Sequence, residues 1–400
     1  MLLITFIDRI GSGLWASVSV LYFTYVSGLS VTQIGTLAAV SGAVGIAGAP
    51  LGGRIADRFP LTRILIALQL LRALASFGLL TSDHYLPLLA ISAVGSLGDR
   101  ASSVLTKLYS ARIARADRVR YQAVNRTCSN AGWALGGLAA AAALTVGTTT
   151  AYRWLLTGDA LSFLAIALLT LTCAEPPSSS RVAATGTAPR DARPANPWRD
   201  RTYLGYVATD LVLFLDDSVF QVGLPLWIAH TAGVPHGLAP LLLVLNNVMV
   251  VAFQVPLARY GTTTAAARRL LVPLSAASAA GGVTMALSAT GGTQAICLLT
   301  ASAALFTLAE MLHAVVSWEL SLALAPDAAQ GAYLGVHGLA QSGQRSIGPL
   351  AVTAAIATGP LGWTVFGATI AATCALQHRL VGDRLRRSPL SVPPVTVSEH

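Results

Sequence analysis

The sequence predicts an all-α integral membrane protein with twelve transmembrane helices arranged in two six-helix halves. Of its 400 residues, 54% are hydrophobic and only 11% are charged, whereas a soluble domain carries about 25% charged residues. The mean hydropathy is +0.64, and apolar stretches of about 20 residues, long enough to cross a bilayer, recur along the chain. A soluble enzyme, a disordered chain and a disulfide scaffold are therefore excluded as classes.

Twelve apolar segments are separated by turn residues such as Pro60, the Gly291-Gly292 pair and Pro326. The first begins at Met1 without a basic region or cleavage site, so we interpret it as a helix and not a signal peptide. The predicted helices of the first half span residues 3–26, 33–53, 62–82, 86–108, 122–147 and 152–173. Those of the second half span residues 203–229, 237–258, 268–289, 293–318, 331–358 and 360–380.

A segment rich in proline, serine and charge divides the two sets of helices. We predict an N-terminal half at 1–175, a linker at 176–202, a C-terminal half at 203–381 and a tail at 382–400. Basic residues concentrate in the segments on one side of the predicted membrane, which predicts a multi-pass inner-membrane protein with both termini, the linker and the tail in the cytoplasm.

Ionisable side chains within these spans are the main functional candidates, because a charge at membrane depth costs several kcal/mol. We expect the proton-coupling residues among Asp216, Asp217, Glu310, Asp8 and Asp99. Their expected charge partners are Arg9, Arg100, Arg126, Arg345 and His313. Asp8-Arg9 and Asp99-Arg100 would pair crosswise between their helices, and the alternative to coupling is an ion-pair cluster that only stabilises the bundle.

Asp216 and Asp217 lie near the middle of the seventh predicted helix with no basic neighbour on that helix. Such a carboxylate needs a proton or a partner, and Arg345 lies at similar depth. Glu310 and His313 share one helical face, which is compatible with a proton relay or a simple hydrogen bond. A second such pair is absent from the sequence, so no metal site is predicted.

Two stripes of small residues indicate surfaces on which helices approach closely. One consists of Gly42, Gly45, Gly48 and Gly52, and the other of Gly335, Gly338, Gly343 and Gly348. We interpret them as surfaces that slide and seal between the halves, with ordinary tight packing as the alternative.

The segment from Gly53 to Arg63 resembles the loop signature of the major facilitator superfamily, with Gly53, Asp57, Arg58 and Arg63 at its characteristic positions. Gly132 and Gly136 resemble part of the signature of its twelve-span drug:proton antiporters. This resemblance implies that the stretch from Gly53 to Arg63 is a cytoplasmic gate. It also implies a central cavity, whose candidate lining residues are Trp15, Tyr22, Asn130, Trp133, Gln221, Asn246 and Gln341.

The sequence contains no nucleotide-binding or hydrolase motif, so we expect neither an enzyme nor a cofactor. The predicted function is secondary transport by alternating access, with proton-coupled efflux of a small amphipathic drug or natural product. Proton-linked uptake of a metabolite and a transport-inactive sensor of the same fold are the alternatives. The expected partners are a small-molecule substrate, protons or another ion and the lipid bilayer, without nucleic acid, and the protein is expected to work as a monomer.

Overall fold

The computed structural model describes residues 1–114, 117–144, 148–176, 196–235 and 237–387. This part of the chain is built from helices. Those of the first half are α1 (Leu2–Tyr25), α2 (Val31–Arg58), α3 (Leu61–Gly78), α4 (Tyr85–Ala114), α5 (Arg118–Leu144) and α6 (Thr149–Leu171). After a short turn, η2 (Pro197–Arg199), come α8 (Arg201–Leu213), η3 (Phe214–Asp216), η4 (Val219–Gly223), α9 (Leu224–His230), α10 (Leu238–Ala258), η5 (Arg259–Gly261), α11 (Thr264–Leu287), η6 (Ser288–Thr290), α12 (Gly292–Ala323), η7 (Asp327–Ala329), α13 (Gln330–Ala357) and α14 (Pro360–Arg387).

The segments from α8 to α9 follow one another as a single broken rod, and with it the described residues form twelve long helical rods. Seven stretches are long and apolar enough to cross a membrane, judged by length and composition over the described residues. They are Thr32–Arg58, Leu61–Gly78, Thr149–Leu171, Arg201–His230, Leu238–Gly261, Thr264–Thr290 and Gly292–Ala323.

Local sequence signals explain where several helices begin and end. Ser30 and Gln33 form a reciprocal capping box at the start of α2, with hydrogen bonds of 3.3 and 2.9 Å. Thr148 and Thr263 cap α6 and α11 with their hydroxyl oxygens alone, which accept from the N–H groups of Ala151 and Ala266. Pro60 follows the last residues of α2 and prevents the helix from continuing.

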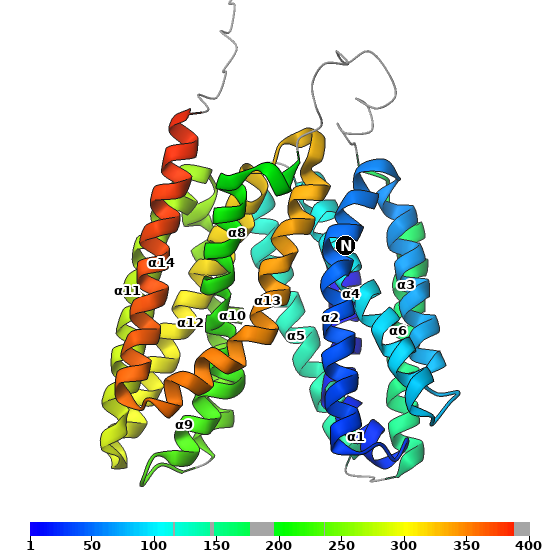
Figure 1. The fold of residues 1–400 in the computed structure, drawn as a ribbon, viewed down its shortest axis with the longest axis horizontal. Helices are drawn as coiled ribbons and strands as arrows, with labels where there is room; N and C mark the ends of the chain where they lie inside the picture. Colours follow the sequence, from blue (N-terminus) through cyan, green and yellow to red (C-terminus); the bar gives the residue numbers. More distant parts are fainter. Residues whose placement is uncertain (115–116, 145–147, 177–195, 236, 388–400) are drawn as a thin grey trace, which may run out of the picture.

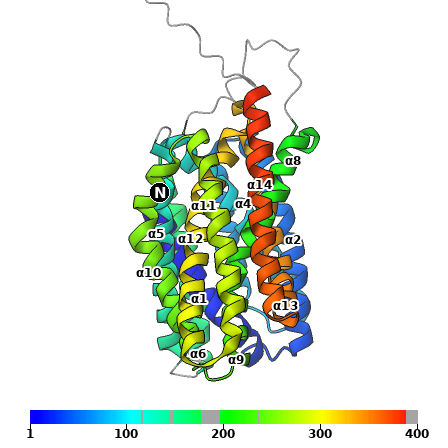
Figure 2. The same ribbon diagram turned by 90° about the vertical axis from the view of Figure 1, so that its left-hand side faces the viewer.

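The helices form two groups, α1–α6 and α8–α14, which stand side by side in Figure 1 and are seen from the second side in Figure 2. We call one end of the molecule the basic end: it holds the α2–α3, α4–α5, α10–α11 and α12–α13 connections and carries Arg58, Arg63, Arg112, Arg118 and Arg259. The ribbons of α2 and α13 converge toward this end, the upper one in Figure 1.

An apolar cluster joins the two groups near the basic end. Val104 and Leu108 of α4 are buried together with Trp318 of α12 and Leu334 of α13. Below this cluster, each group has its own core, and the larger one extends from Tyr203 to Val381 in the second group. The described residues therefore form two separately packed bundles that are sealed against each other at the basic end.

Several predicted boundaries differ from the structure. The stretch predicted as a loop from Gly53 is helical as far as Arg58, and α4, α12 and α14 also run several residues past their predicted ends. The predicted helix 203–229 is broken in its middle. Of the predicted linker, residues 177–195 lie outside the described residues, as do residues 388–400 of the predicted tail.

Candidate functional site

The broken rod places two acids at an irregular turn in the middle of the second bundle. Regular α8 ends at Leu213, a tight turn carries Asp216, and a wide turn follows from Val219 to Gly223. Pro225 lies at the start of α9 and has no N–H to continue the helical ladder. Tight and wide turns within a long helix often mark functional positions.

Asp216 is a buried acid with an incomplete set of partners. It is 3% exposed, and its Oδ1 atom has no hydrogen-bond partner among the described residues. Its neighbouring charges are those of His313, Asp217, Glu310 and Arg126. Asp216, Asp217 and Glu310 thus lie in one region at membrane depth, where the charge on each acid affects the other two.

Asp217 is half-buried and lies at the edge of this acidic region. The charges of Glu310, Arg126 and Arg345 act on it. Arg345 belongs to α13 and also acts on Asp99 of the first bundle. The charge of Arg345 therefore acts on an acid of each half, and Arg345 forms no ion pair among the described residues.

Glu310 forms an ion pair with Arg126 that links the halves. The second carboxylate oxygen of Glu310 accepts a hydrogen bond of 2.7 Å from Asn246 of α10, which also donates to Thr307 at 3.1 Å. Asn246, which we expected to line a cavity, is thus used to hold Glu310. His313, the expected partner of Glu310, contacts Asp210 instead.

Asp210 is the centre of a buried polar cluster in the second bundle. Its carboxylate is fully buried and lies 3.1 Å from His313 Nε2 and 2.7 Å from His337 Nε2. Ser317 donates a hydrogen bond of 2.8 Å to it and Gln377 one of 3.3 Å. His313, one of the charge partners expected from the sequence, is therefore bound by Asp210.

The cluster around Asp210 reaches across to the first bundle through Lys107, the only lysine in the sequence. Lys107 Nζ lies 3.4 Å from His337 Nδ1. With Nε2 of His337 donating to Asp210, Nδ1 is left to accept from the ammonium group. The ammonium also lies 5.3 Å from the ring centroid of Trp318, a cation–π geometry.

The first bundle has a different pairing from the predicted crosswise one. Arg72 of α3 forms ion pairs with Asp8 at 2.8 Å and with Asp99 at 3.0 Å. Its guanidinium lies over the ring of Phe163 at 4.0 Å. Neither Arg9 nor Arg100 forms an ion pair in the described part of the chain, so the expected partners of these two acids are not the observed ones.

Sequence reasoning also missed Asp159 and Glu319. Asp159 of α6 is 3% exposed and accepts a hydrogen bond of 3.0 Å from Ser76. Glu319 of α12 is 1% exposed and forms an ion pair of 2.6 Å with Arg118 across the halves. Asp159 lies within a predicted span, so the same rule on charges at membrane depth would have found it.

Hydrogen bonds and ion pairs connect the halves between the basic end and the middle of the bundle. Asp57 of the predicted gate accepts hydrogen bonds from the backbone N–H groups of Gly331 at 3.0 Å and Ala332 at 2.8 Å. Lys107, Arg118 and Arg126 make further contacts of this kind. Gly53 packs against Gly331, whereas Arg58 and Arg63 are exposed on the surface.

The predicted cavity residues divide into two groups. Tyr22 is 1% exposed and donates a 3.0 Å hydrogen bond to the carbonyl of Leu79, and Trp15 packs edge-on against Phe23 at 5.8 Å. Tyr22 therefore belongs to the packed interior of the first bundle and not to a cavity lining. The others keep exposed or half-exposed side chains: Asn130, Trp133, Gln221 and Gln341.

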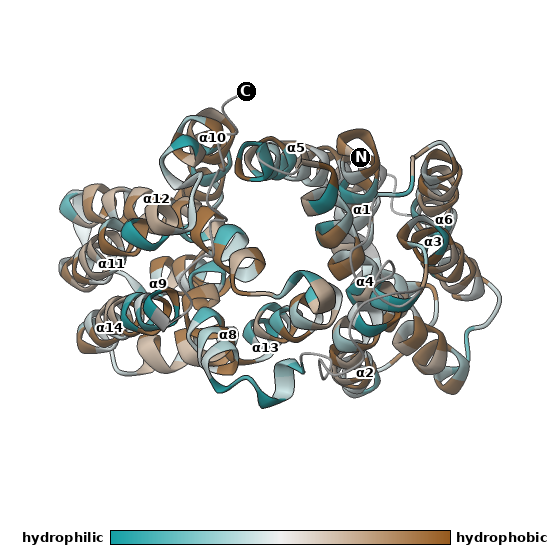
Figure 3. Cartoon of the chain, turned by 90° about the horizontal axis from the view of Figure 1, so that it is seen from above, coloured by the Kyte–Doolittle hydropathy of each residue, from teal (hydrophilic) through white to brown (hydrophobic). Residues whose placement is uncertain are grey.

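Figure 3 shows how the two groups face each other when the molecule is seen from above, with α1, α2, α4 and α5 on one side and α8, α10, α12 and α13 on the other. These helices and the irregular turn after α8 carry the acids and arginines described above, except Arg63 and Arg72 of α3 and Asp159 of α6. The outer helices α3, α6, α11 and α14 support them from behind.

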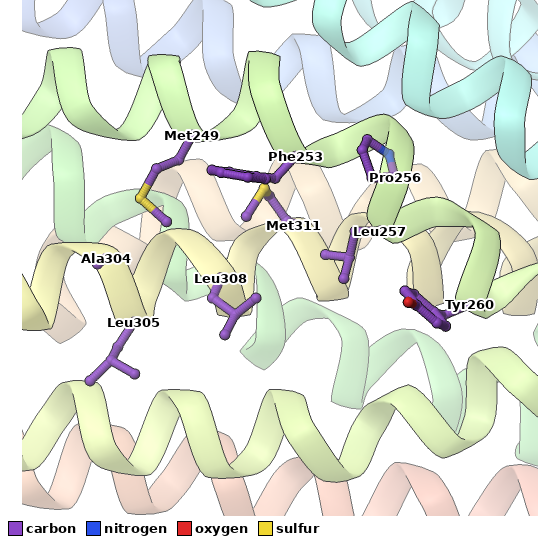
Figure 4. Close-up of a pocket in the computed structure, with 9 residues that line it drawn as sticks. All are labelled: Met249, Phe253, Pro256, Leu257, Tyr260, Ala304, Leu305, Leu308 and Met311. Atoms are coloured by element: carbon purple, nitrogen blue, oxygen red, sulfur yellow. The ribbon is translucent and has the colours of Figure 1, made fainter.

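A groove of about 420 Å³ lies between α10 and α12 (Figure 4). Apart from the Tyr260 hydroxyl, its side chains are apolar, and Phe253 is 56% exposed on its rim. It is lined by Met249, Phe253, Pro256, Leu257, Tyr260, Ala304, Leu305, Leu308 and Met311. The groove offers neither an acid nor an arginine, so we place the candidate site at the charged middle of the bundle.

Comparisons with known proteins identify the architecture. The chain is similar to the crystal structure of a bacterial homologue of the iron transporter ferroportin in an outward-facing state, with a TM-score of 0.70, 15% identity and coverage of 96% of this chain and 97% of that one. It is also similar to the proton:xylose symporter XylE bound to 6-bromo-6-deoxy-D-glucose (TM-score 0.68, 15% identity, coverage 95% and 93%) and to the E. coli fucose:proton symporter FucP (TM-score 0.70, 13% identity, coverage 96% and 97%).

Curated proteins gave no match to the sequence. The family model described as Major Facilitator Superfamily matches residues 1–349. Since this match covers most of the 400 residues, and the twelve helical rods and similar structures agree with it, the chain belongs to the major facilitator superfamily of membrane transporters.

Proposed function

We propose that the protein is a proton-coupled secondary transporter that exports a small amphipathic compound by alternating access. The observation that carries the proposal is Asp216, a carboxyl group that is 3% exposed, has one oxygen without a partner and lies next to Asp217. An unpaired charge at this depth costs several kcal/mol, and binding a proton removes that cost by neutralising the carboxylate. Two similar structures are proton symporters, so proton-coupled transport occurs on this fold.

The contacts between the halves support alternating access. Opening the basic end requires the contacts of Asp57, Lys107, Arg118 and Arg126 with the second bundle to break. Figure 1 shows the two groups of ribbons further apart at the other end. By the distribution of basic residues, we assign the basic end to the cytoplasm and the protein to the inner membrane, with both termini cytoplasmic.

Polar contacts connect the proposed proton site with this closure. The charges of Glu310 and His313 act on Asp216. Glu310 binds Arg126 of the first half, and His313 is linked through Asp210 and His337 to Lys107 of the first half. A change of charge at Asp216 therefore changes the electrostatic energy of two contacts between the halves, which is how protonation would favour opening or closing.

The test is proton movement in liposomes that contain the purified protein and a pH-sensitive dye. Hydrophobic cations, amphipathic anions, natural-product antibiotics and sugars are added in turn. We expect at least one compound to drive proton flux that Asp216→Asn abolishes while binding of the compound survives. Asp83→Asn, at an exposed site between α3 and α4, is the matched control. Compound movement with unchanged proton flux in Asp216→Asn and Asp217→Asn would refute the coupling assignment.

One observation favours the second candidate, proton-linked uptake. Arg345 interacts electrostatically with Asp217. Protonation of Asp217 would remove the negative charge that attracts Arg345. If the substrate binds Arg345, proton binding and substrate binding then favour each other, as co-transport requires. Measuring whether cells that produce the protein accumulate or exclude the compound distinguishes the two directions.

A further inference from the structure

We propose that Arg9, Arg100 and Arg345 form the binding site for an anionic group on the transported compound. The compound would carry a carboxylate, sulfonate or phosphate ester on an apolar body. The proposal rests on the proposed transport function, because it names the class of substrate. Its first evidence is that the acids next to Arg9 and Arg100 in the sequence are both paired with Arg72, so neither acid neutralises these two arginines.

Arg72 supplies the positive charge for both acids that precede Arg9 and Arg100 in the sequence. One guanidinium group lies 2.8 Å from Asp8 and 3.0 Å from Asp99. Asp8 of α1 and Asp99 of α4 therefore lie at the same level, one at each nitrogen end of the Arg72 guanidinium. Consecutive helical residues point about 100° apart, so Arg9 and Arg100 extend from neighbouring positions in directions other than that of Arg72.

Close packing fixes where these two side chains begin. A Cβ atom at Gly132 of α5 would lie 3.0 Å from the Cβ of Arg9, and one at Gly48 of α2 would lie 3.1 Å from the Cβ of Arg100. Gly48 lies ten residues before Arg58, the last residue of α2, and thus about 15 Å from the basic end. This is near the middle of a bilayer core about 30 Å thick.

The two arginines lack the partners that such a depth demands. Arg9 and Arg100 are half-buried and form no ion pair in the described ranges, and Arg9 Nε is buried without a hydrogen-bond partner. Asp99 keeps 43% of its side chain exposed while paired with Arg72, so the position between the helices is accessible. A buried donor without an acceptor is unfavourable unless a ligand or water satisfies it.

Arg345 adds a third cation from the other half. It is exposed on α13, fifteen residues after the helix start at Gln330, which is about 22 Å along the helix. The charges of Arg9, Arg100 and Arg345 all act on Asp99, and Arg100 and Arg345 act on each other. An anion held by the three would touch both bundles, which suits a substrate that moves when the bundles rearrange.

Chemistry favours an oxyanion at this position. A guanidinium group offers paired N–H donors that match the two oxygens of a carboxylate or phosphate. Trp133, which follows Gly132 on α5 and is 47% exposed, is the candidate apolar surface for the body of the compound. A negative interior potential drives an anion outward, which suits export. Protonation of Asp217 would release Arg345 for the anion, which suits co-transport. The site therefore fits either direction, and the accumulation measurement given above decides between them.

The nearby acids limit the site but do not fill it. Asp8 and Asp99 are bound by Arg72, Asp159 is hydrogen-bonded to Ser76, and Glu310 is bound by Arg126. Asp217 is the acid that competes with an anion for Arg345.

The test uses small probes that any accessible site of this kind can accept. Binding of benzoate and benzenesulfonate to the full-length protein in detergent is measured by equilibrium dialysis at constant ionic strength, with benzamide and benzylammonium as the neutral and cationic counterparts. We expect the two anions to bind and the counterparts not to. Arg9→Gln, Arg100→Gln and Arg345→Gln should each weaken anion binding about tenfold, the effect of losing one hydrogen bond to a charged group.

Controls separate the anion site from folding and from proton coupling. Arg269→Gln removes an exposed arginine of α11 and should leave binding unchanged. Arg100→Lys keeps the charge and should retain part of the affinity, which guards against misfolding of the glutamine variant. The proposal is overturned if neither anion binds, if benzamide binds as well as benzoate, or if the three glutamine variants bind like wild type. Asp216→Asn should still bind the anions, so failure of the coupling assignment leaves this result intact.

Discussion

Asp57 at the end of α2 caps the first turn of α13 in the other half of the protein, through hydrogen bonds of 3.0 Å from Gly331 N–H and 2.8 Å from Ala332 N–H. The first N–H groups of a helix have no partner within it. A carboxylate there also interacts favourably with the positive end of the helix dipole. The resemblance to a gate signature implied a cytoplasmic position for Asp57, and the structure gives this residue a contact between the halves at the basic end.

Asp57→Asn should shift the protein toward states open at the basic end. The amide keeps one acceptor and loses the negative charge, which we expect to weaken the closed state by about 1.5 kcal/mol, or about tenfold in population. Spin labels at Phe59 and Tyr260, exposed positions of the two halves near this end, report the distance in a background without native cysteines. Asp83→Asn should leave the distance distribution as in wild type, and an unchanged distribution in Asp57→Asn would contradict the role of Asp57.

Gly53→Ala should hinder closure by direct collision. A Cβ at this position would meet the carbonyl oxygen of Gly331 and would lie 3.0 Å from the Cα of Gly335. These are backbone atoms and cannot rotate away, and overpacking of this kind costs about 1–3 kcal/mol. We expect the transport rate in liposomes to fall about tenfold or more. Gly35→Ala on the same helix is the matched control, because its Cβ would meet no atom within 4 Å; equal rates for both variants would count against the collision.

The fold could be predicted because its determinants are local. Length and apolar composition predict helices, and the Gly53 to Arg63 stretch predicts the family. The break in the rod at Phe214 to Gly223 gives a weaker signal, since Pro225 lies beyond it and the intervening residues suit a regular helix. Its irregular turns depend on packing against the neighbouring helices.

Pairing within the site depends on distances between helices, which one sequence does not contain. Any of several arginines at similar depth suited Asp8 and Asp99, and the structure selects Arg72. His313 shares a helical face with Glu310 by spacing, yet it binds Asp210, because α8 brings that carboxylate within 3.1 Å. The sequence therefore predicts the depth of each charged residue and the sign of its charge, but it does not predict which residues pair.

Asp210→Asn should destabilise the second bundle. The fully buried carboxylate accepts from Ser317 and Gln377 and contacts both histidines. An amide cannot accept at both ends, so buried donors lose their partner at a cost of about 3 kcal/mol. Thermal unfolding in detergent measures this loss. Ser317→Ala removes one hydrogen bond and should cost only about 1 kcal/mol, and similar melting temperatures for Asp210→Asn and wild type would show that Asp210 is not the centre of the cluster.

Asp200 makes a pH-dependent contribution to stability at the basic end. It caps α8 by accepting a 3.0 Å hydrogen bond from Tyr203 N–H, and both of its oxygens accept from Arg384, at 2.8 and 2.7 Å. Burial raises the pKa of the Asp200 carboxyl, but the hydrogen bonds from Arg384 and Tyr203 and the positive charge of Arg384 outweigh this, so its pKa is below the usual range. A carboxyl whose pKa falls on folding stabilises the folded state while it is ionised.

This stabilisation is complete above the unfolded pKa of about 3.9 and is lost as the pH falls through the lower folded pKa. Asp200→Asn should therefore unfold at a lower temperature than wild type near neutral pH, and the difference should shrink as the pH is lowered below about 4. Because asparagine also caps helices, the variant keeps its cap, whereas Asp200→Ala should lose about 1 kcal/mol more at every pH. Asp383→Asn, which removes a 54% exposed acid paired with Arg386, should change the unfolding temperature little. Parallel curves for wild type and Asp200→Asn across this range would mean that the Arg384 contact does not depend on ionisation of Asp200.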